Sequence, residues 1–200
     1  MRMKFIGVTG GIGAGKSSVS KILEDRGAQV IDADLLSHQV VELGKPAYHQ
    51  IIEEFGIEVL QNDGSLDRKR LAEIVFQKPK LRRKLETIVH AEVINAMLER
   101  INSLKRQSYK GLVVLDVPIP VEHGFLDTAD TVWVVTASEE TRIKRVVARS
   151  GLSVEEAKRR IQSQLSQEEY IRLADEIIEN EDSIEDLRKK IEKLVSKIML

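Results

Sequence analysis

Short apolar runs alternate along this chain with longer stretches in which apolar residues recur at helical spacing. The runs cover residues 5–8, 30–31, 112–115 and 132–135, and a weaker fifth covers residues 177–178. Because the apolar residues are continuous within a run, the pattern indicates strands buried on both faces, as in a parallel sheet. The helical stretches between the runs indicate βαβ units. The pattern therefore predicts an α/β fold of three layers around a five-stranded parallel sheet.

The last predicted helix is the most regular one. Its apolar positions are separated by three, four, three, one and three residues: Ile184, Leu187, Ile191, Leu194, Val195 and Ile198. Ser183, with Asp186 three residues later, has the spacing of a capping box at the start of a helix. We expect this helix to pack against the core, and we assign it no chemistry.

Residues 37–110 differ from the rest of the chain in their pattern of apolar residues. They contain helical patterns and turn signals at residues 62–64 and 78–79, but no convincing strand pattern. A stretch of this length is too long for a simple crossover between two parallel strands. We therefore expect residues 1–36 and 111–200 to form the core, and residues 37–110 to form a mainly helical insertion.

The segment after the first apolar run carries the strongest chemical signal. Residues 10–17 read Gly-Gly-Ile-Gly-Ala-Gly-Lys-Ser and match the phosphate-binding pattern G-x-x-x-x-G-K-[ST] completely. Glycines let the backbone turn its N–H groups toward one point, and the following helix adds its N-terminal dipole. Lys16 supplies a positive charge for the β- and γ-phosphates, and the Ser17 hydroxyl is a ligand for Mg²⁺. The expected ATP-binding residues of this segment are Gly11, Gly13, Ala14, Gly15, Lys16, Ser17 and Ser18.

The surroundings of this loop argue against a glycine-rich turn that binds nothing. A strand pattern precedes it directly and an amphipathic stretch, residues 16–26, follows it, as the motif requires. The chain has no Asn-Lys-x-Asp motif of the kind that reads guanine in GTPases. No Glu accompanies Asp116 at the end of the third predicted strand, which argues against a motor or an AAA-type ATPase. The small size favours a P-loop kinase that acts on a small metabolite.

Composition and charge narrow the range of partners. The 200 residues carry 31 Lys and Arg against 32 Asp and Glu, for a net charge of -1. This balance gives no reason to expect nucleic acid or an anionic membrane as partner, and no obligate protein partner is evident. Cys is absent, which fits a reducing cytoplasm, and there is no signal-peptide or transmembrane pattern. We therefore expect a cytoplasmic protein.

Two carboxylates follow the second predicted strand, at Asp32 and Asp34. Ligands of doubly wound sheets bind at the carboxyl ends of the strands, so a carboxylate there can orient and deprotonate an acceptor hydroxyl. Asp32 is our preferred catalytic base. Asp34 is either the N-cap of the next helix or a second acceptor-binding carboxylate. Asp116 either holds Mg²⁺ or is only a turn residue at the end of a strand.

An arginine-rich flap is predicted over residues 139–165. Arg142, Arg145 and Arg149 are spaced three and four residues apart and share one helix face. Gly151 ends that helix, and Ser153 with Glu156 has the spacing that caps the next one. The flap is either a solvated basic face or a lid that closes over the nucleotide. If it is a lid, we expect Arg145 and Arg149 to stabilise charge on the phosphoryl group in transfer.

Taken in order, these motifs resemble the dephospho-coenzyme A kinase family. The phosphate-binding segment 9–17, followed by Val-Ile-Asp-Ala-Asp at residues 30–34, is similar to that family. The resemblance continues with Asp-Gly-Ser-Leu-Asp-Arg at 63–68, Leu-Glu-Thr-Ile-Val-His at 85–90 and Val-Leu-Asp-Val-Pro at 114–118. In the flap and the last strand it rests on residues 145, 149, 151–153, 155–157, 160–161, 164, 174–175 and 180.

The chain departs from the family pattern at four places. The family usually has His-Pro where this chain has His90-Ala91, and Pro-Leu-Leu-Phe-Glu where residues 118–122 read Pro-Ile-Pro-Val-Glu. A Gln is common where Arg142 stands, and a Lys is common where Tyr170 stands. All four departures leave the predicted catalytic groups in place, and the one at residues 118–122 bears on the acceptor contacts.

The resemblance implies a reaction and a set of roles. The reaction is transfer of the ATP γ-phosphoryl group to the ribose 3′-hydroxyl of dephospho-coenzyme A, the last step of coenzyme A biosynthesis. ATP and dephospho-coenzyme A are then the substrates, with Mg²⁺ as cofactor. A kinase of another small acceptor and an ATP-binding regulatory protein remain the alternatives. The implied roles are ATP binding for Asn180, catalysis for Lys16, Asp32, Arg145 and Arg149, metal binding for Ser17 and Asp116, and acceptor binding for Thr9, Asp32, Asp34, Arg68 and His90.

Overall fold

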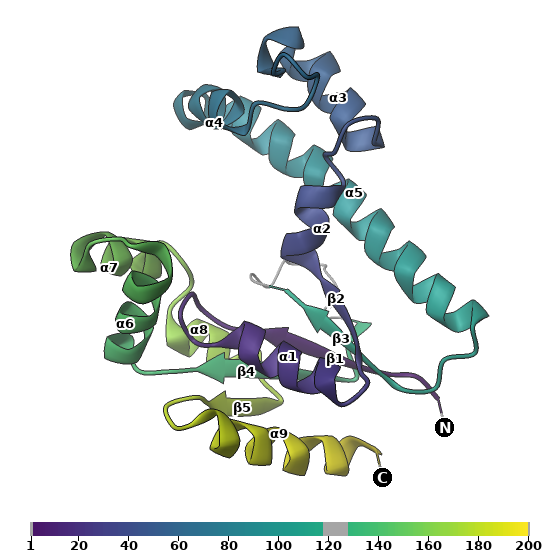
Figure 1. Ribbon diagram of the computed structural model, residues 1–200, viewed down its shortest axis with the longest axis vertical. Helices are drawn as coiled ribbons and strands as arrows, with labels where there is room; N and C mark the ends of the chain where they lie inside the picture. Colours follow the sequence, from purple (N-terminus) through teal and green to yellow (C-terminus); the bar gives the residue numbers. More distant parts are fainter. Residues whose placement is uncertain (1, 118–127, 200) are drawn as a thin grey trace. The chain divides into compact units, whose positions relative to one another are not determined.

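The computed structural model of the chain describes residues 2–117 and 128–199 (Figure 1). It divides into two compact units. One unit consists of Met1–Asp32 and Tyr109–Leu200, and the other of Ala33–Ser108. The segment 118–122, one of the departures from the family pattern, lies outside the described residues. No helix of the described residues is long and apolar enough to cross a membrane.

The first unit is built on one five-stranded sheet, as predicted. All neighbouring strands are parallel, and their order is β2-β3-β1-β4-β5. Each predicted apolar run lies in one of these strands, with the strand ends extending a residue or two beyond the run. The strands are β1 (Lys4–Thr9), β2 (Gln29–Asp32), β3 (Leu112–Asp116), β4 (Thr131–Thr136) and β5 (Glu176–Glu179).

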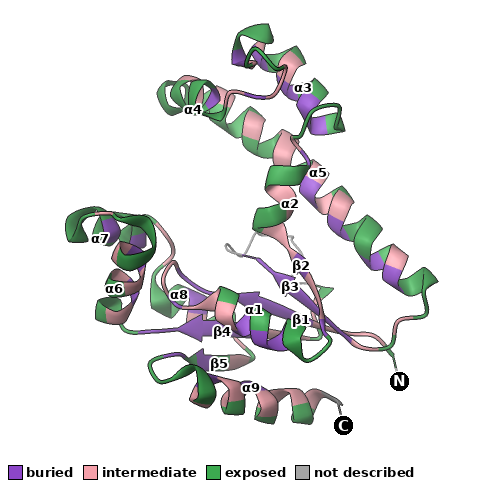
Figure 2. Cartoon of the chain, in the orientation of Figure 1, coloured by how far each residue is buried: buried purple, intermediate pink, exposed green. Residues whose placement is uncertain are grey.

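Helices α1 (Lys16–Asp25) and α9 (Ile184–Met199) pack together over one face of the sheet (Figure 1). The core between them and the strands is centred on Trp133, which is fully buried. Residues that point to the opposite face of the strands, such as Val113 and Leu115, are also fully buried. Strand β3 is purple along its whole length in Figure 2, and β1 and β4 are purple over their last four residues, which explains why their sequences are apolar without alternation.

Polar side chains cap the helices where the sequence predicts them. The N–H of Asp186 donates to Ser183 Oγ (3.2 Å) at the start of α9. Gly151, with φ of 65°, ends α6 (Glu139–Ser150). Ser153 and Glu156 form a reciprocal capping box at the start of α7 (Val154–Gln162). Ser166 forms a second such box at the start of α8 (Gln167–Ile171), which the sequence analysis did not identify.

The second unit is helical and has a core of its own. Its elements are α2 (Ala33–Gln39), α3 (Pro46–Phe55), the 3₁₀ turn η1 (Ile57–Val59), α4 (Arg68–Gln77) and α5 (Pro79–Arg106). Ile51 and Val59 are fully buried at the centre of this core. Leu60 and Leu66 make an isolated antiparallel bridge that brackets the turn at residues 62–64. The unit begins at Ala33 and ends at Ser108.

The start of α2 corrects one expectation. Asp34 is not an N-cap, because the helix already begins at Ala33 and Asp34 lies within its first turn. A carboxylate in the first turn still interacts favourably with the helix dipole, but it does not receive the terminal N–H groups as a cap does. An N-cap was considered because Asp34 directly precedes two leucines, which could have been the first apolar residues of the helix. The helix instead begins at Ala33, directly after β2 ends at Asp32.

Packing of α9 against the sheet makes a testable contribution to stability. Ile191 is fully buried in the core, so Ile191→Ala removes apolar contacts and leaves a cavity. We expect the free energy of unfolding to fall by about 2–5 kcal/mol, measured by urea denaturation. Lys193 on the same helix is exposed, and Lys193→Ala should change it by less than about 0.5 kcal/mol. Equal effects of the two substitutions would contradict the packing described for α9.

Candidate functional site

Three glycines with positive φ shape the loop between β1 and α1. Gly10 has φ of 151°, Gly13 has φ of 80°, and Gly15, the residue before α1, has φ of 99°. A β-carbon at Gly15 would collide with the side-chain amide of Asn180, and one at Gly13 would come within 2.6 Å of the Arg142 carbonyl oxygen. Both positions therefore need glycine for conformation and for space.

The carbonyl groups of this loop are bound by side chains from outside it. Asn180 Nδ2 donates to the Ala14 oxygen at 2.8 Å. Arg145 Nη1 donates to the same oxygen at 3.2 Å, and its Nη2 donates to the Asn180 oxygen at 2.9 Å. These bonds fix the loop from the side of its carbonyl groups.

Most N–H groups of the loop, in contrast, have no hydrogen-bond acceptor within the described part of the chain. Within the described part of the chain, the N–H groups of Gly13, Gly15, Lys16 and Ser17 donate to no protein group. Backbone N–H groups are otherwise almost always paired, so a run of free donors at the start of α1 is the arrangement that receives an anion. The loop can therefore bind phosphate oxygens through its backbone.

The residue after Asn180, Glu181, attaches this part of the chain to the start of α6. The Glu181 carboxylate accepts from the N–H of Ser138 and from Thr141 Oγ1 (2.7 Å), at the start of α6. The bond from the Ser138 N–H, followed by that from Thr141, lowers the pKa of Glu181. The end of β5 is thereby tied to α6, and the two groups that bind the Ala14 carbonyl are held together.

Lys16 and Asp116 form an ion pair beneath the loop. Asp116 ends β3 and is 3% exposed, and its second oxygen accepts from Ser20 Oγ at 2.6 Å. A buried carboxylate needs such partners, because an unpaired charge is costly away from water. The lysine charge is therefore neutralised by the protein until a phosphate competes for it.

Asp32 and Asp116 are register partners at the carboxyl ends of β2 and β3. Asp32 was predicted as the catalytic base because it lies at the carboxyl end of the second predicted strand. In the sheet, β3 stands between β1 and β2, so Asp116 is the nearer carboxylate and Asp32 lies one strand further away. Asp32 is half-buried on that edge.

The three arginines of α6 lie in three different environments. Arg142 is 6% exposed, Arg145 is half-buried with its guanidinium on the loop carbonyls, and Arg149 is exposed. In the described part of the chain the Arg149 side chain makes no ion pair or hydrogen bond. Of these three arginines, only Arg149 fits the alternative of a solvated basic face.

Of the predicted acceptor-binding residues, three lie in the helical unit. Asp34 is exposed on α2, His90 is half-buried on α5, and Arg68 binds the His38 ring and the His38 oxygen (3.4 Å). Thr9, at the end of β1, is fully buried, and its hydroxyl has no partner within the described residues. The roles of these residues remain predictions.

Comparison with known proteins decides the family. Residues 4–186 match the family model for dephospho-CoA kinase. The chain belongs to the dephospho-CoA kinase family. A dephospho-CoA kinase from Symbiobacterium thermophilum is 45% identical over 190 residues, which cover 95% of this chain and 79% of that protein. One from Carboxydothermus hydrogenoformans is 39% identical, over 98% of this chain and 94% of its own length.

Solved structures agree with this assignment to the dephospho-CoA kinase family. Dephospho-CoA kinase from Campylobacter jejuni superposes with a TM-score of 0.73 at 30% identity, covering 98% of this chain and 97% of that one. Protein TT1252 from Thermus thermophilus superposes with a TM-score of 0.83 at 34% identity, covering 98% of each chain. A shikimate kinase from Acinetobacter baumannii, with a TM-score of 0.54 at 21% identity over 99% of this chain and 96% of its own, shares the fold.

The contacts that three residues make at or near the loop were not predicted from the sequence. Ser20 lies one helical turn after Lys16, and its spacing alone was a usable signal. Gln164 was noted only as part of the resemblance, yet its Oε1 accepts from the Ile12 N–H at 2.7 Å. Arg142 was grouped with the flap arginines, although its Nε donates to the Ile12 oxygen at 3.0 Å. Only the fold brings these two side chains to the loop.

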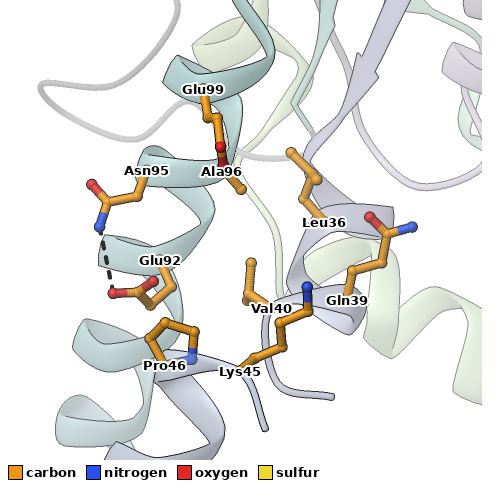
Figure 3. Close-up of a pocket in the computed structure, with 9 residues that line it drawn as sticks. All are labelled: Leu36, Gln39, Val40, Lys45, Pro46, Glu92, Asn95, Ala96 and Glu99. Atoms are coloured by element: carbon orange, nitrogen blue, oxygen red, sulfur yellow. Dashed lines mark hydrogen bonds between the residues drawn. The ribbon is translucent and has the colours of Figure 1, made fainter. Parts of the chain in front are cut away.

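The helical unit of this kinase family member also contains a cavity of about 240 Å³ (Figure 3). Leu36, Val40 and Ala96 give it an apolar lining. Glu92 and Glu99 add two carboxylates from α5, against one lysine, Lys45. Carboxylates repel phosphate groups, so we assign this cavity no part in binding a phosphorylated substrate.

Oxygen donors suited to Mg²⁺ are present at the loop itself. Ser17 is exposed in the first turn of α1, and the Asp116 carboxylate lies beneath the loop. Within the described residues no three His, Cys, Asp or Glu side chains gather as a metal site. A hydroxyl and one carboxylate, completed by phosphate and water oxygens, are the ligands Mg²⁺ takes in nucleotide sites.

Substitution of Lys16 tests the loop directly. Lys16→Ala removes the ammonium group that now pairs with Asp116 and that we expect to bind the phosphates. We expect turnover to fall at least about a hundredfold, roughly 3 kcal/mol of lost stabilisation, measured as ADP formation. Circular dichroism should show a folded protein, with some loss of stability because Asp116 then lacks its ion pair. Near-normal turnover of the folded variant would contradict the loop assignment.

Proposed function

We propose that this chain transfers the γ-phosphoryl group of ATP to the ribose 3′-hydroxyl of dephospho-coenzyme A and releases coenzyme A. The observation that carries the proposal is the set of free loop N–H groups beside the Lys16–Asp116 pair, in a chain of the dephospho-CoA kinase family. The reaction is the last step of coenzyme A biosynthesis. Absence of cysteine suits a reducing compartment, and we assign the reaction to the cytoplasm.

Nucleotide binding uses the loop in the way its hydrogen bonds allow. The phosphates are attracted by the N-terminal end of the α1 dipole and by the free N–H groups of Gly13, Gly15, Lys16 and Ser17. Lys16 exchanges the Asp116 carboxylate for β- and γ-phosphate oxygens. Arg145 and Asn180 keep the loop carbonyls turned away from the anion.

Ser17 and Asp116 are the proposed residues for Mg²⁺. When bound, the ion neutralises negative charge on the phosphate oxygens. The Asp116 carboxylate would be available to the ion once Lys16 turns to the phosphates, and Ser20 would continue to hold its second oxygen.

Asp32 is the proposed base for the acceptor hydroxyl. A ribose hydroxyl is a weak nucleophile at neutral pH and needs alignment and an acceptor for its proton. Asp32 stands at the carboxyl end of β2, half-buried and in register with Asp116. Thr9, Asp34, Arg68 and His90 are the proposed acceptor contacts, of which Arg68 has its guanidinium on His38 before substrate binds.

The acceptor is tested by measuring ADP formation with dephospho-coenzyme A, with nucleoside monophosphates and without acceptor. We expect ADP to form at a substantial rate only with dephospho-coenzyme A, and phosphorus NMR should place the new phosphate on the 3′-oxygen. Faster ADP formation with a nucleoside monophosphate would indicate a different acceptor. Equal formation in every sample would indicate an ATPase.

Asp32→Asn tests the base. The amide keeps the shape and an accepting oxygen but loses the negative charge and the basicity. We expect ATP and acceptor binding to be nearly preserved and kcat to fall by about 10²–10⁴. Asp34→Asn is the comparison, because that carboxylate is proposed to bind and not to take the proton, and should mainly raise KM for the acceptor. If Asp34→Asn is the inactive variant, the two roles are exchanged.

The lid is tested on two basic residues of α6. Arg149 is exposed and unpaired within the described residues, so a contact with the transferring group forms only on closure. We expect Arg149→Ala to lower kcat about tenfold or more, with a smaller change in KM. Lys144 is equally exposed but pairs with Glu140 one turn away, and Lys144→Ala should leave both constants unchanged. Identical kinetics of the two variants would show that Arg149 is only surface.

A further inference from the structure

Ile12 stands in the middle of the phosphate-binding loop, and both of its backbone polar groups are bound by side chains of the lid segment, residues 139–165. Its N–H donates to Gln164 Oε1 at 2.7 Å. Its oxygen accepts from Arg142 Nε at 3.0 Å. Arg142 comes from α6 and Gln164 from the segment that follows α7, so two separate parts of the lid segment each send one side chain to the same residue.

Arg142 also occupies the space beside the two glycines that flank Ile12. A β-carbon at Gly11 would collide with the Arg142 guanidinium. A β-carbon at Gly13 would come within 2.6 Å of the Arg142 backbone oxygen. The loop therefore lies directly on this residue, and its glycines allow that close approach.

Fold stability does not account for Arg142. The residue is 6% exposed, and within the described part of the chain its Nη2 is buried without a hydrogen-bond partner. Burial lowers the pKa of Arg142, against the smaller opposing effects of Tyr170 and Glu139. A buried cation with an unpaired nitrogen is less favourable than an apolar side chain of similar volume. Its bond to the loop is the contact that remains to explain it.

We propose that Arg142 and Gln164 are positioning residues that jointly hold the Ile12 peptide, so that the free N–H groups of Gly13, Gly15, Lys16 and Ser17 converge on the nucleotide phosphates. The inference rests on the proposed binding of ATP by this loop. Both side chains act through the loop and contact no substrate. Because both come from the lid segment, the orientation of the loop depends on how that segment packs.

The test measures binding of ADP with Mg²⁺ by titration calorimetry, in the absence of any acceptor. Gln164→Leu removes the acceptor of the Ile12 N–H, and Arg142→Met removes the donor to the Ile12 oxygen while keeping the stem. We expect each substitution to weaken ADP binding roughly five- to tenfold. The double variant should lose less than the product of the two, because both side chains hold one peptide. The unfolding temperature of Arg142→Met should not fall.

Gln162→Leu is the matched control. Gln162 lines the same cavity of about 500 Å³ as Arg142 and Gln164, but it is exposed and its side chain makes no hydrogen bond within the described residues. ADP affinity of this variant should equal that of the parent. If Arg142→Met does not fold, the comparison of Gln164→Leu with Gln162→Leu decides the question.

Two results would overturn the proposal. One is ADP affinity within twofold of the parent in both folded variants, which would make the contacts merely structural. The other is a double variant whose loss equals the product of the single losses, which would show that the two side chains act separately. A parent protein that binds ADP but does not phosphorylate dephospho-coenzyme A would overturn the proposed function and leave this inference intact.

Discussion

A loop that binds phosphate through its backbone has to keep several N–H groups free of protein acceptors. Free backbone groups favour any rearrangement that would pair them, so the rest of the structure has to hold the loop open. Here the restraint comes through the carbonyl groups, which are bound by Arg142, Arg145 and Asn180. Glu181 joins the segment after β5 to the start of α6. These two parts of the chain carry Asn180 and Arg145, so they hold the loop as well as forming part of the sheet and its helices.

The fold and the loop could be predicted because their signals are local. Five apolar runs became five parallel strands, and the eight-residue motif followed the first of them. Helix caps at Ser153 and Ser183 were equally predictable, since a cap joins residues three positions apart. Signals of this kind need no knowledge of which segments meet in space.

The parts that could not be predicted depend on tertiary contacts. The strand order, with β3 between β1 and β2, makes Asp116 and not Asp32 the carboxylate that pairs with Lys16. Three arginines of one helix look alike in sequence, yet burial separates Arg142 from Arg149. An N-cap was one of two alternatives for Asp34, and it is excluded because the helix already begins at Ala33, directly where a strand ends. Side-chain chemistry identified the candidates, and only the fold assigned their partners.

The Lys16–Asp116 pair has a consequence for competition among cellular anions. Because the lysine charge is already satisfied by a buried carboxylate, an anion that offers one phosphate group exchanges one ion pair for another and gains little. In the proposed function, ATP with Mg²⁺ would bring a new partner for Lys16 and a new partner for Asp116 at the same time. The existing ion pair would then favour binding of the nucleotide with its cation over binding of orthophosphate alone.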